Sequence, residues 1–276
     1  MAEALLEETV AERDERYLGI LLKALSVSAG YKPKFGKGGK VGLTSDEFEA
    51  LHAADPFYHW IGLDSPLLYA AHKAAGGITS VYRQVGRGCE LIIRKVLEEE
   101  FGMTEEEARW EYSVPTPDGG SRTLALDGRI DLEFIRRADA KRRFETWLDQ
   151  ARKEVGVADE VTLKGTVFET RQGYKSKDAK RQNADIANAA SAYANAYLPT
   201  LIMLSTQLDS DIAVRYRAAK WLILIGTVDP EASAVESTYA FARDALGFDL
   251  AAFFERVSDR VRMETEKILA SLLAAE

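Results

Sequence analysis

The stretch Gly128-Arg-Ile-Asp-Leu-Glu-Phe134 alternates charged and apolar side chains. Because successive side chains of a β-strand point to opposite faces of the sheet, a strand here places Arg129, Asp131 and Glu133 on one face. The other face carries apolar side chains, which suits burial in a core. We therefore predict a strand over residues 123–135 with one buried face and one charged face.

A second stretch, Val167-Phe-Glu-Thr-Arg-Gln-Gly-Tyr-Lys-Ser-Lys177, has the same alternation farther along the chain. We predict a strand over residues 162–174, and its period of two places Glu169, Arg171, Gly173 and Lys175 on one face, with Lys177 on the same face if the strand persists. If the two strands are neighbours with their charged faces aligned, two or three carboxylates meet beside a guanidinium and an ammonium group. A cross-strand ladder of salt bridges explains the same pattern without catalysis, so the pattern alone leaves both interpretations open.

The surrounding segments alternate between helical and strand periodicity. Helices are predicted over residues 87–101, 139–155 and 178–197, and further strands over residues 110–114, 200–205 and 221–225. This order is typical of a mixed α/β fold, and we predict a central mixed β-sheet of about four to six strands, flanked by helices and with helical additions at both ends. Between residues 45 and 80 we expect short helices, with Gly76-Gly77 among the turns.

The charged strand faces have the groups that phosphodiester hydrolysis needs. Mg²⁺ prefers hard oxygen ligands, polarises a bound phosphate and makes a bound water more acidic. In this interpretation Asp131 and Glu169 hold the metal ion, and Glu133 is a further or substitute ligand. A cation at Arg171 or Lys175 contacts the scissile phosphate or positions the attacking water, and stabilises the charge that develops.

The residues, their spacing and the surrounding elements over residues 86–226 resemble the PD-(D/E)XK nuclease superfamily, and more narrowly a type II restriction endonuclease. In that family a helix with a glutamate precedes a strand with the metal-binding aspartate, and a second strand follows with Glu-x-Lys. Here Gly86-Arg-Gly-Cys-Glu90 opens the helix, Asp131 matches the aspartate, and Glu169-Thr-Arg171 occupies the Glu-x-Lys position. The resemblance implies a restriction-endonuclease-like core, an accessory carboxylate at Glu90 and metal ligands at Asp131 and Glu169.

Two positions depart from the family pattern. Arg171 stands where lysine is usual, and arginine does not give up a proton near neutral pH, so it could stabilise charge but not act as a base. Lys175 is the alternative cation. The residue before Asp131 is Ile130 rather than proline, and Asp127 is a second candidate for the metal-binding aspartate.

The segment that follows Glu169 is basic, although the chain has a formal net charge of −8. Arginine and lysine pair with guanine edges, asparagine and glutamine pair with adenine, and a helix N-terminus accepts phosphate. The residues expected to contact double-stranded DNA here are Lys175, Lys177, Lys180, Arg181, Gln182 and Asn183. The alternative is the solvated end of an amphipathic helix.

A basic loop over residues 31–40, Tyr31-Lys-Pro-Lys-Phe-Gly-Lys-Gly-Gly-Lys40, carries four lysines and three glycines. It lacks the Gly-Lys-Ser/Thr ending of a phosphate-binding loop, which argues against a nucleoside triphosphate site. We predict that Lys37 and Lys40 contact the DNA backbone, and the alternative is a flexible solvated loop.

Composition argues against several other classes of protein. The 276 residues are 46% hydrophobic and 29% charged, which is enough for a sizeable core. We find neither an apolar run typical of a membrane span nor a start typical of a secretory signal. The single cysteine, Cys89, can form neither an internal disulfide nor a cysteine-based zinc site. We therefore expect a cytoplasmic protein with no membrane partner.

The predicted organisation is a helical N-terminal region over residues 1–85, a nuclease core over residues 86–226, and C-terminal helices over residues 227–276 that pack on the core, with one single domain as the alternative. The leading hypothesis is a Mg²⁺-dependent homodimer that cuts a short duplex sequence, because a palindromic site suits a two-fold protein. The resemblance further implies functional pairing with a DNA methyltransferase. The alternatives are a structure-specific repair or recombination nuclease of the same superfamily and a non-catalytic helical binding protein.

Overall fold

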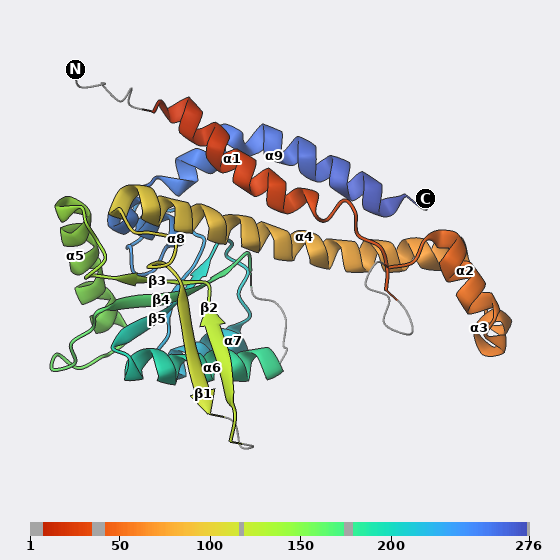
Figure 1. The fold of residues 1–276 in the computed structure, drawn as a ribbon. Helices are drawn as coiled ribbons and strands as arrows, with labels where there is room; N and C mark the ends of the chain where they lie inside the picture. The colour runs from red at the N-terminus through yellow and green to blue at the C-terminus, as the bar shows by residue number, and fades with distance from the viewer. Residues whose placement is uncertain (1–7, 35–41, 116–118, 174–178, 275–276) are drawn as a thin grey trace. The chain divides into compact units, whose positions relative to one another are not determined.

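The computed structural model describes residues 8–34, 42–115, 119–173 and 179–274. It confirms the mixed α/β fold (Figure 1). The chain divides into two compact units, of which one is formed by Met1–Gly88 with Glu255–Glu276 and the other by Cys89–Phe254. Residues 227–254 thus belong to the unit that contains the predicted core, whereas the last 22 residues, 255–276, belong with the N-terminal region.

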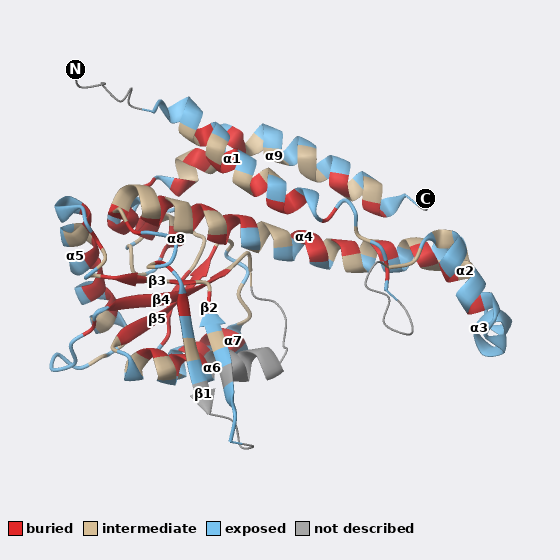
Figure 2. Ribbon diagram, in the orientation of Figure 1, coloured by how far each residue is buried: buried red, intermediate tan, exposed pale blue. Residues whose placement is uncertain are grey.

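The larger unit contains a four-stranded mixed sheet in the order β3-β4-β5-β6. Its strands are β3 (Gly128–Asp131), β4 (Gly165–Arg171), β5 (Tyr197–Met203) and β6 (Leu222–Leu224). β3 is antiparallel to β4, and β4, β5 and β6 are parallel to one another. Figure 2 shows β3, β4 and β5 as buried strands, and β5 and β6 are buried at every residue. Continuous apolar runs of this kind are typical of parallel strands covered on both faces.

Helices pack around this sheet. On one face, side chains of β4, β5 and β6 share a core cluster with side chains of α6 (Ala179–Ala194) and α7 (Ser210–Ala218). Elsewhere in the unit, α5 (Ala138–Glu154) contacts two π-helical segments, η1 (Leu97–Phe101) and η2 (Ala242–Leu246). The short helix α8 (Thr238–Phe241) is tied to the end of β5, because the Thr238 hydroxyl donates to the Met203 carbonyl oxygen at 2.7 Å.

The predicted strand over residues 123–135 is wrong, because two strands in two sheets occupy this stretch. β2 (Ser121–Leu126) pairs with β1 (Trp110–Pro115) in a separate antiparallel hairpin, and β3 ends at Asp131. The Glu133 backbone N–H donates to Asp131 Oδ1 at 2.9 Å, which closes a turn after the strand. Glu133 therefore lies exposed in this turn and not on a strand face beside Asp131.

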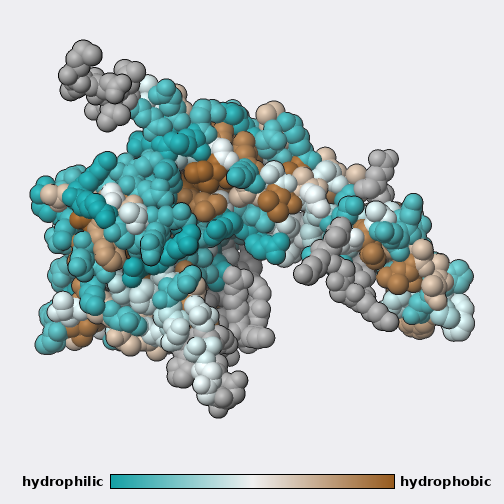
Figure 3. Space-filling model, in the orientation of Figure 1, coloured by the Kyte–Doolittle hydropathy of each residue, from teal (hydrophilic) through white to brown (hydrophobic). Residues whose placement is uncertain are grey.

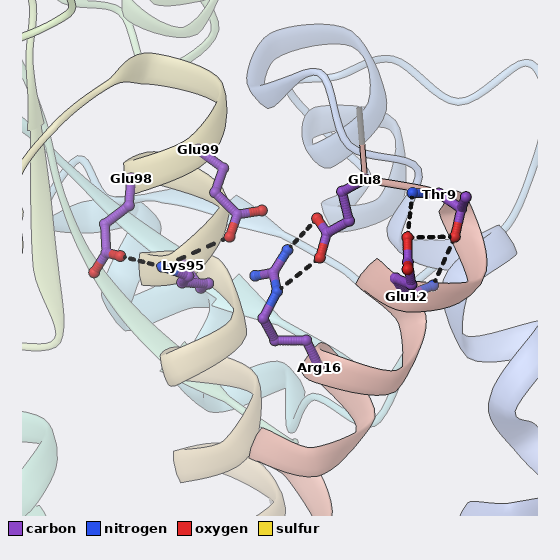
Figure 4. Close-up of polar contacts among 7 residues, drawn as sticks. All are labelled: Glu8, Thr9, Glu12, Arg16, Lys95, Glu98 and Glu99. Carbon is purple, nitrogen blue, oxygen red and sulfur yellow. Dashed lines mark hydrogen bonds and ion pairs between the residues drawn. The ribbon is translucent and has the colours of Figure 1, made fainter. Parts of the chain in front are cut away.

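The smaller unit is helical, with α1 (Val10–Ser26), α2 (Ser45–Ala53), α3 (Pro56–Trp60) and the first part of α4 (Pro66–Val96). A capping box between Thr9 and Glu12 starts α1, and Arg16 pairs with Glu8 (Figure 4). The long helix α9 (Leu250–Leu273) is tied to α1 within this unit, because Arg256 Nε donates to Asp14 Oδ2 at 2.6 Å.

The predicted turn at Gly76-Gly77 is wrong, because both residues lie inside α4. A Cβ atom at Gly76 would overlap the Tyr31 ring, and one at Gly77 would overlap the Leu272 side chain. Glycine is required here because other parts of the smaller unit approach the helix backbone closely. The sequence suggested a turn because glycine pairs usually mark turns, whereas here the two glycines allow close packing within a helix.

Apolar side chains are exposed at α2, α3 and the start of α4, and Figure 3 shows apolar surface over α2 and α3. Trp60 is 78% exposed and Leu67 is 80% exposed.

Among the described residues, no helix combines the length and the apolar character that crossing a membrane requires.

Candidate active site

The register between β3 and β4 decides which carboxylates meet. The two strands are neighbours, with Gly128 opposite Phe168 and Asp131 opposite Gly165. Asp131 is therefore displaced from Glu169 by four positions along β4, or about 13 Å at about 3.3 Å per residue. The expectation that Asp131 and Glu169 converge is corrected. Carried one residue beyond β3, the same register sets Asp127, the second candidate, opposite Glu169.

Asp127 is bound directly to β4. The Thr170 backbone N–H donates to Asp127 Oδ2 at 2.7 Å. The next residue, Gly128, allows this close approach, since a Cβ there would lie 2.5 Å from Phe168 Cζ and 2.9 Å from the Ala108 carbonyl oxygen. The single-residue link between β2 and β3 thus places a carboxylate beside the Glu169-Thr-Arg171 stretch.

Glu90 reaches the same place from α4. It is 5% exposed, and its Oε1 lies 2.9 Å from Arg94 Nη2, one helical turn farther along. Arg94 Nε in turn donates to the Asp127 carbonyl oxygen at 2.8 Å. The helix that the resemblance assigns to an accessory carboxylate is therefore linked to Asp127 through one guanidinium group.

Glu169 and Arg171 lie together, as expected for two residues on one face of a strand. Arg171 Nη2 is 2.5 Å from Glu169 Oε1, and the two side chains are 13% and 11% exposed. A charged pair this shielded from solvent interacts more strongly than a surface pair, because water screens it less. The guanidinium is thus held at the carboxyl end of β4.

The electrostatic environment of Asp127 differs from that of an ordinary ion-paired acid. Burial, and after it the charge of Glu90, raises the pKa of Asp127 to about 6. The pKa is lowered, but by less, by the hydrogen bond from the Thr170 N–H and by the charges of Arg171 and Arg94. Acids whose pKa is raised by burial and by a neighbouring carboxylate are common where a protein prepares a binding or catalytic site.

The donor set fits a hard divalent cation in chemical type. Asp127, Glu169 and Glu90 offer carboxylate oxygens, which Mg²⁺ prefers. In the described part of the chain no group of three or more His, Cys, Asp or Glu side chains is close enough to hold a metal ion. Mg²⁺ does not need such a group, because it is usually held by one or two carboxylates together with water and substrate phosphate. Asp127 and Glu169, opposite each other, satisfy that smaller requirement.

Asp131 occupies a different environment, at the far end of β3. It is 5% exposed, and the Tyr197 hydroxyl donates to its Oδ2 at 2.5 Å. Burial, together with the bond to Asp131, raises the pKa of Tyr197 to about 12, so the tyrosine stays a neutral donor. With the turn N–H of Glu133 on the other oxygen, Asp131 is a hydrogen-bonded core acid that ties β3 to β5 and to the turn.

The side chains predicted to contact DNA lie outside the part of the chain that the structure describes. Lys37, Lys40, Lys175 and Lys177 lie outside the described residues. The others belong to α6, but their side chains are outside the described part: Lys180, Arg181, Gln182 and Asn183. A cavity of about 340 Å³ beside β6 is lined in part by Glu154, Arg217 and Glu236, and none of the predicted site residues lines it.

Arg94 is the residue of this cluster that sequence reasoning missed. Its signal was the spacing of Glu90 and Arg94, which places opposite charges on one side of a helix. Such pairs are frequent on solvated helices, and burial is what distinguishes this one. Comparison with family models, with curated proteins and with solved structures found no match for this chain.

Proposed function

We propose that this chain is a Mg²⁺-dependent nuclease that hydrolyses phosphodiester bonds in double-stranded DNA. Asp127 and Glu169 would hold the metal ion, with Glu90 as the accessory carboxylate. The observation that carries the proposal is the register of β3 and β4, which sets Asp127 opposite Glu169 where Arg171 and Glu90 also converge. This replaces Asp131 with Asp127 as the metal-binding aspartate.

The side chains divide the work in a way that their chemistry allows. A bound Mg²⁺ supplies Lewis acidity toward the phosphate and a more acidic water. Arg171, fixed by Glu169, can hold the negative charge that grows on the phosphate oxygens, but it cannot take a proton from water. With a pKa of about 6, Asp127 is mainly ionised near pH 8, where it can act as a ligand.

DNA is the proposed substrate because the basic segment follows β4 directly. Between Arg171 and Arg181 the sequence has five basic residues and one acid. A segment attached to the strand that carries Glu169 and Arg171 can bring phosphates to those side chains. The polar pair Gln182 and Asn183 adds groups able to read adenine, which supports a sequence-specific type II restriction endonuclease. A homodimer and a companion DNA methyltransferase belong to the same proposal.

The pKa of Asp127 favours this proposal over a non-catalytic salt-bridge ladder. In a ladder each carboxylate lies beside a cation, which lowers its pKa. Glu90 and Glu169 do face arginines, but the pKa of Asp127 is raised, because burial and Glu90 outweigh both guanidinium groups. The fold therefore disfavours the charged form of Asp127.

The test is cleavage of mixed plasmid DNA with Mg²⁺ and with EDTA. We expect discrete fragments with Mg²⁺ alone. Glu169→Gln should lower turnover by about 100-fold or more if it removes a metal ligand, while DNA binding persists because an anionic charge has been removed. Asp131→Asn, a matched change of a buried acid on the neighbouring strand β3, should keep turnover within about threefold once the folded fraction is measured.

Four outcomes contradict parts of the proposal. Retained turnover in Glu169→Gln would place the metal site elsewhere. Loss of turnover in a folded Asp131→Asn protein would return the metal-binding role to Asp131. Cutting confined to branched substrates would identify a structure-specific nuclease, and the absence of any Mg²⁺-dependent cleavage would favour a binding protein.

A further inference from the structure

Arg94 connects two residues of the proposed site, Glu90 on α4 and Asp127 between β2 and β3. Its Nη2 pairs with Glu90 Oε1 at 2.9 Å, and its Nε donates to the Asp127 carbonyl oxygen at 2.8 Å. Nη2 also donates to the same carbonyl oxygen. The Arg94 side chain is 15% exposed. One shielded guanidinium therefore holds a carboxylate on α4 and the backbone at Asp127.

The backbone at Asp127 depends on such support. Asp127 is the single residue between β2, which ends at Leu126 in one sheet, and β3, which begins at Gly128 in another. It belongs to neither strand ladder. Among the described residues, Arg94 donates to its carbonyl oxygen and the Thr170 N–H donates to its carboxylate. Because the backbone rotation at this residue aims the carboxylate, a fixed carbonyl fixes the direction of the side chain.

We propose that Arg94 is a positioning residue of this site, one that sets the Asp127 carboxylate opposite Glu169 and keeps Glu90 beside it. The inference rests on the proposed nuclease function. The planar guanidinium makes the link possible, because its several N–H donors point in fixed directions and can serve two acceptors at once. A lysine amine has the same charge without this fork.

The next residue along α4 supplies a control. Lys95 Nζ pairs with Glu98 Oε2 at 2.7 Å and with Glu99 Oε1 at 3.6 Å, both in η1 (Figure 4). The Lys95 side chain is 34% exposed, and both of these carboxylates lie outside the site. Lys95→Met thus removes one helical cation and its ion pairs next to Arg94 while leaving the Asp127 link intact.

The experiment compares Arg94→Lys, Arg94→Met and Lys95→Met. In Arg94→Lys we expect kcat to fall by about 10- to 100-fold and KM for duplex DNA to stay within about twofold, since misplacing a reacting group costs rate while the basic segment still binds DNA. Arg94→Met should lose at least as much. Lys95→Met should keep both constants within about twofold of wild type.

A readout without DNA separates positioning from general destabilisation. Mn²⁺ binding is measured by calorimetric titration at a temperature where all variants are folded. In Arg94→Lys the Mn²⁺ affinity should fall by about five- to tenfold or more, because residues that orient metal ligands contribute to metal affinity. In Lys95→Met the Mn²⁺ affinity should be unchanged. A purely structural role would lower the unfolding temperature and leave the kcat and Mn²⁺ affinity of the folded protein unchanged.

Wild-type kcat and Mn²⁺ affinity in Arg94→Lys, with an active wild-type protein, would overturn the inference and leave the nuclease proposal standing. A rise in KM without a change in kcat would also overturn it, because that result assigns Arg94 to DNA binding. A wild-type protein that neither cuts DNA nor binds Mn²⁺ would overturn both proposals.

Discussion

Replacing Asp127 with asparagine should stabilise the fold and abolish cleavage in the same protein. The wild-type carboxylate is held near Glu90 with a pKa raised to about 6, chiefly by burial. Asparagine has nearly the same shape, and its amide oxygen can still accept the Thr170 N–H that donates to Asp127 Oδ2 at 2.7 Å. The substitution therefore removes the charge that the fold disfavours and, with it, the proposed metal ligand.

The size of the effect follows from the pKa. An acid with a pKa of about 6 in the folded chain and 3.8 when unfolded binds protons more tightly in the folded chain. Its protonated form contributes stability that is fully present below about pH 4 and is lost as the pH rises through about 6. The pKa difference corresponds to about 3 kcal/mol as an upper bound, and partial exposure reduces the expected gain of Asp127→Asn at pH 8 to about 1–2 kcal/mol.

Urea unfolding without divalent metal ions, at pH 4.0 and pH 8.0, measures this difference. We expect wild type and Asp127→Asn to be close in stability at the lower pH and the variant to be more stable at the higher pH. Plasmid cleavage in Mg²⁺ should fall by about 100-fold or more. Two results would refute the account of Asp127 as a buried acid repelled by Glu90. One is a variant less stable than wild type at pH 8.0, and the other is a variant more stable than wild type by the same amount at pH 4.0 and pH 8.0.

Two further substitutions test the packing around the site. Gly128→Ala should lower the free energy of unfolding by about 1–3 kcal/mol, measured in urea, because its Cβ would lie 2.5 Å from Phe168 Cζ; an unchanged midpoint would mean that the ring can move aside. Tyr197→Phe should cost about 1–3 kcal/mol, since it removes the hydroxyl that donates to Asp131, and should leave the kcat of the folded protein unchanged; a loss of kcat would connect Asp131 with the chemistry.

The strand pattern around Glu169 was readable from the sequence because charge and apolar character alternate there. Residues 162–174 were expected as a strand, and β4 spans Gly165–Arg171. The mixed sheet was also predicted, since buried parallel strands such as β5 consist of continuous apolar residues. These features are local, and local periodicity is what a sequence displays.

The register between the strands was not readable in the same way. Asp127 and Asp131 lie four residues apart and have the same alternation, so side-chain period alone cannot tell which one faces Glu169. The break between β2 and β3 falls at Asp127, within a stretch that has the pattern of one long strand. The break arises because β2 pairs with β1 and β3 pairs with β4 in a different sheet. Strand pairing of this kind is not visible in the local sequence.

The surroundings of Asp127 and Asp131 explain why we propose only Asp127 as a metal ligand. Asp131 has a neutral donor on one oxygen and a turn N–H on the other, an arrangement that satisfies a buried carboxylate. In the described part of the chain, the Asp127 carboxylate accepts from the Thr170 N–H and lies near Glu90, whose charge opposes its own. Packing alone does not require that arrangement, because an uncharged residue would remove the repulsion. A divalent cation would remove it as well, and for that reason we propose Asp127 as a metal ligand.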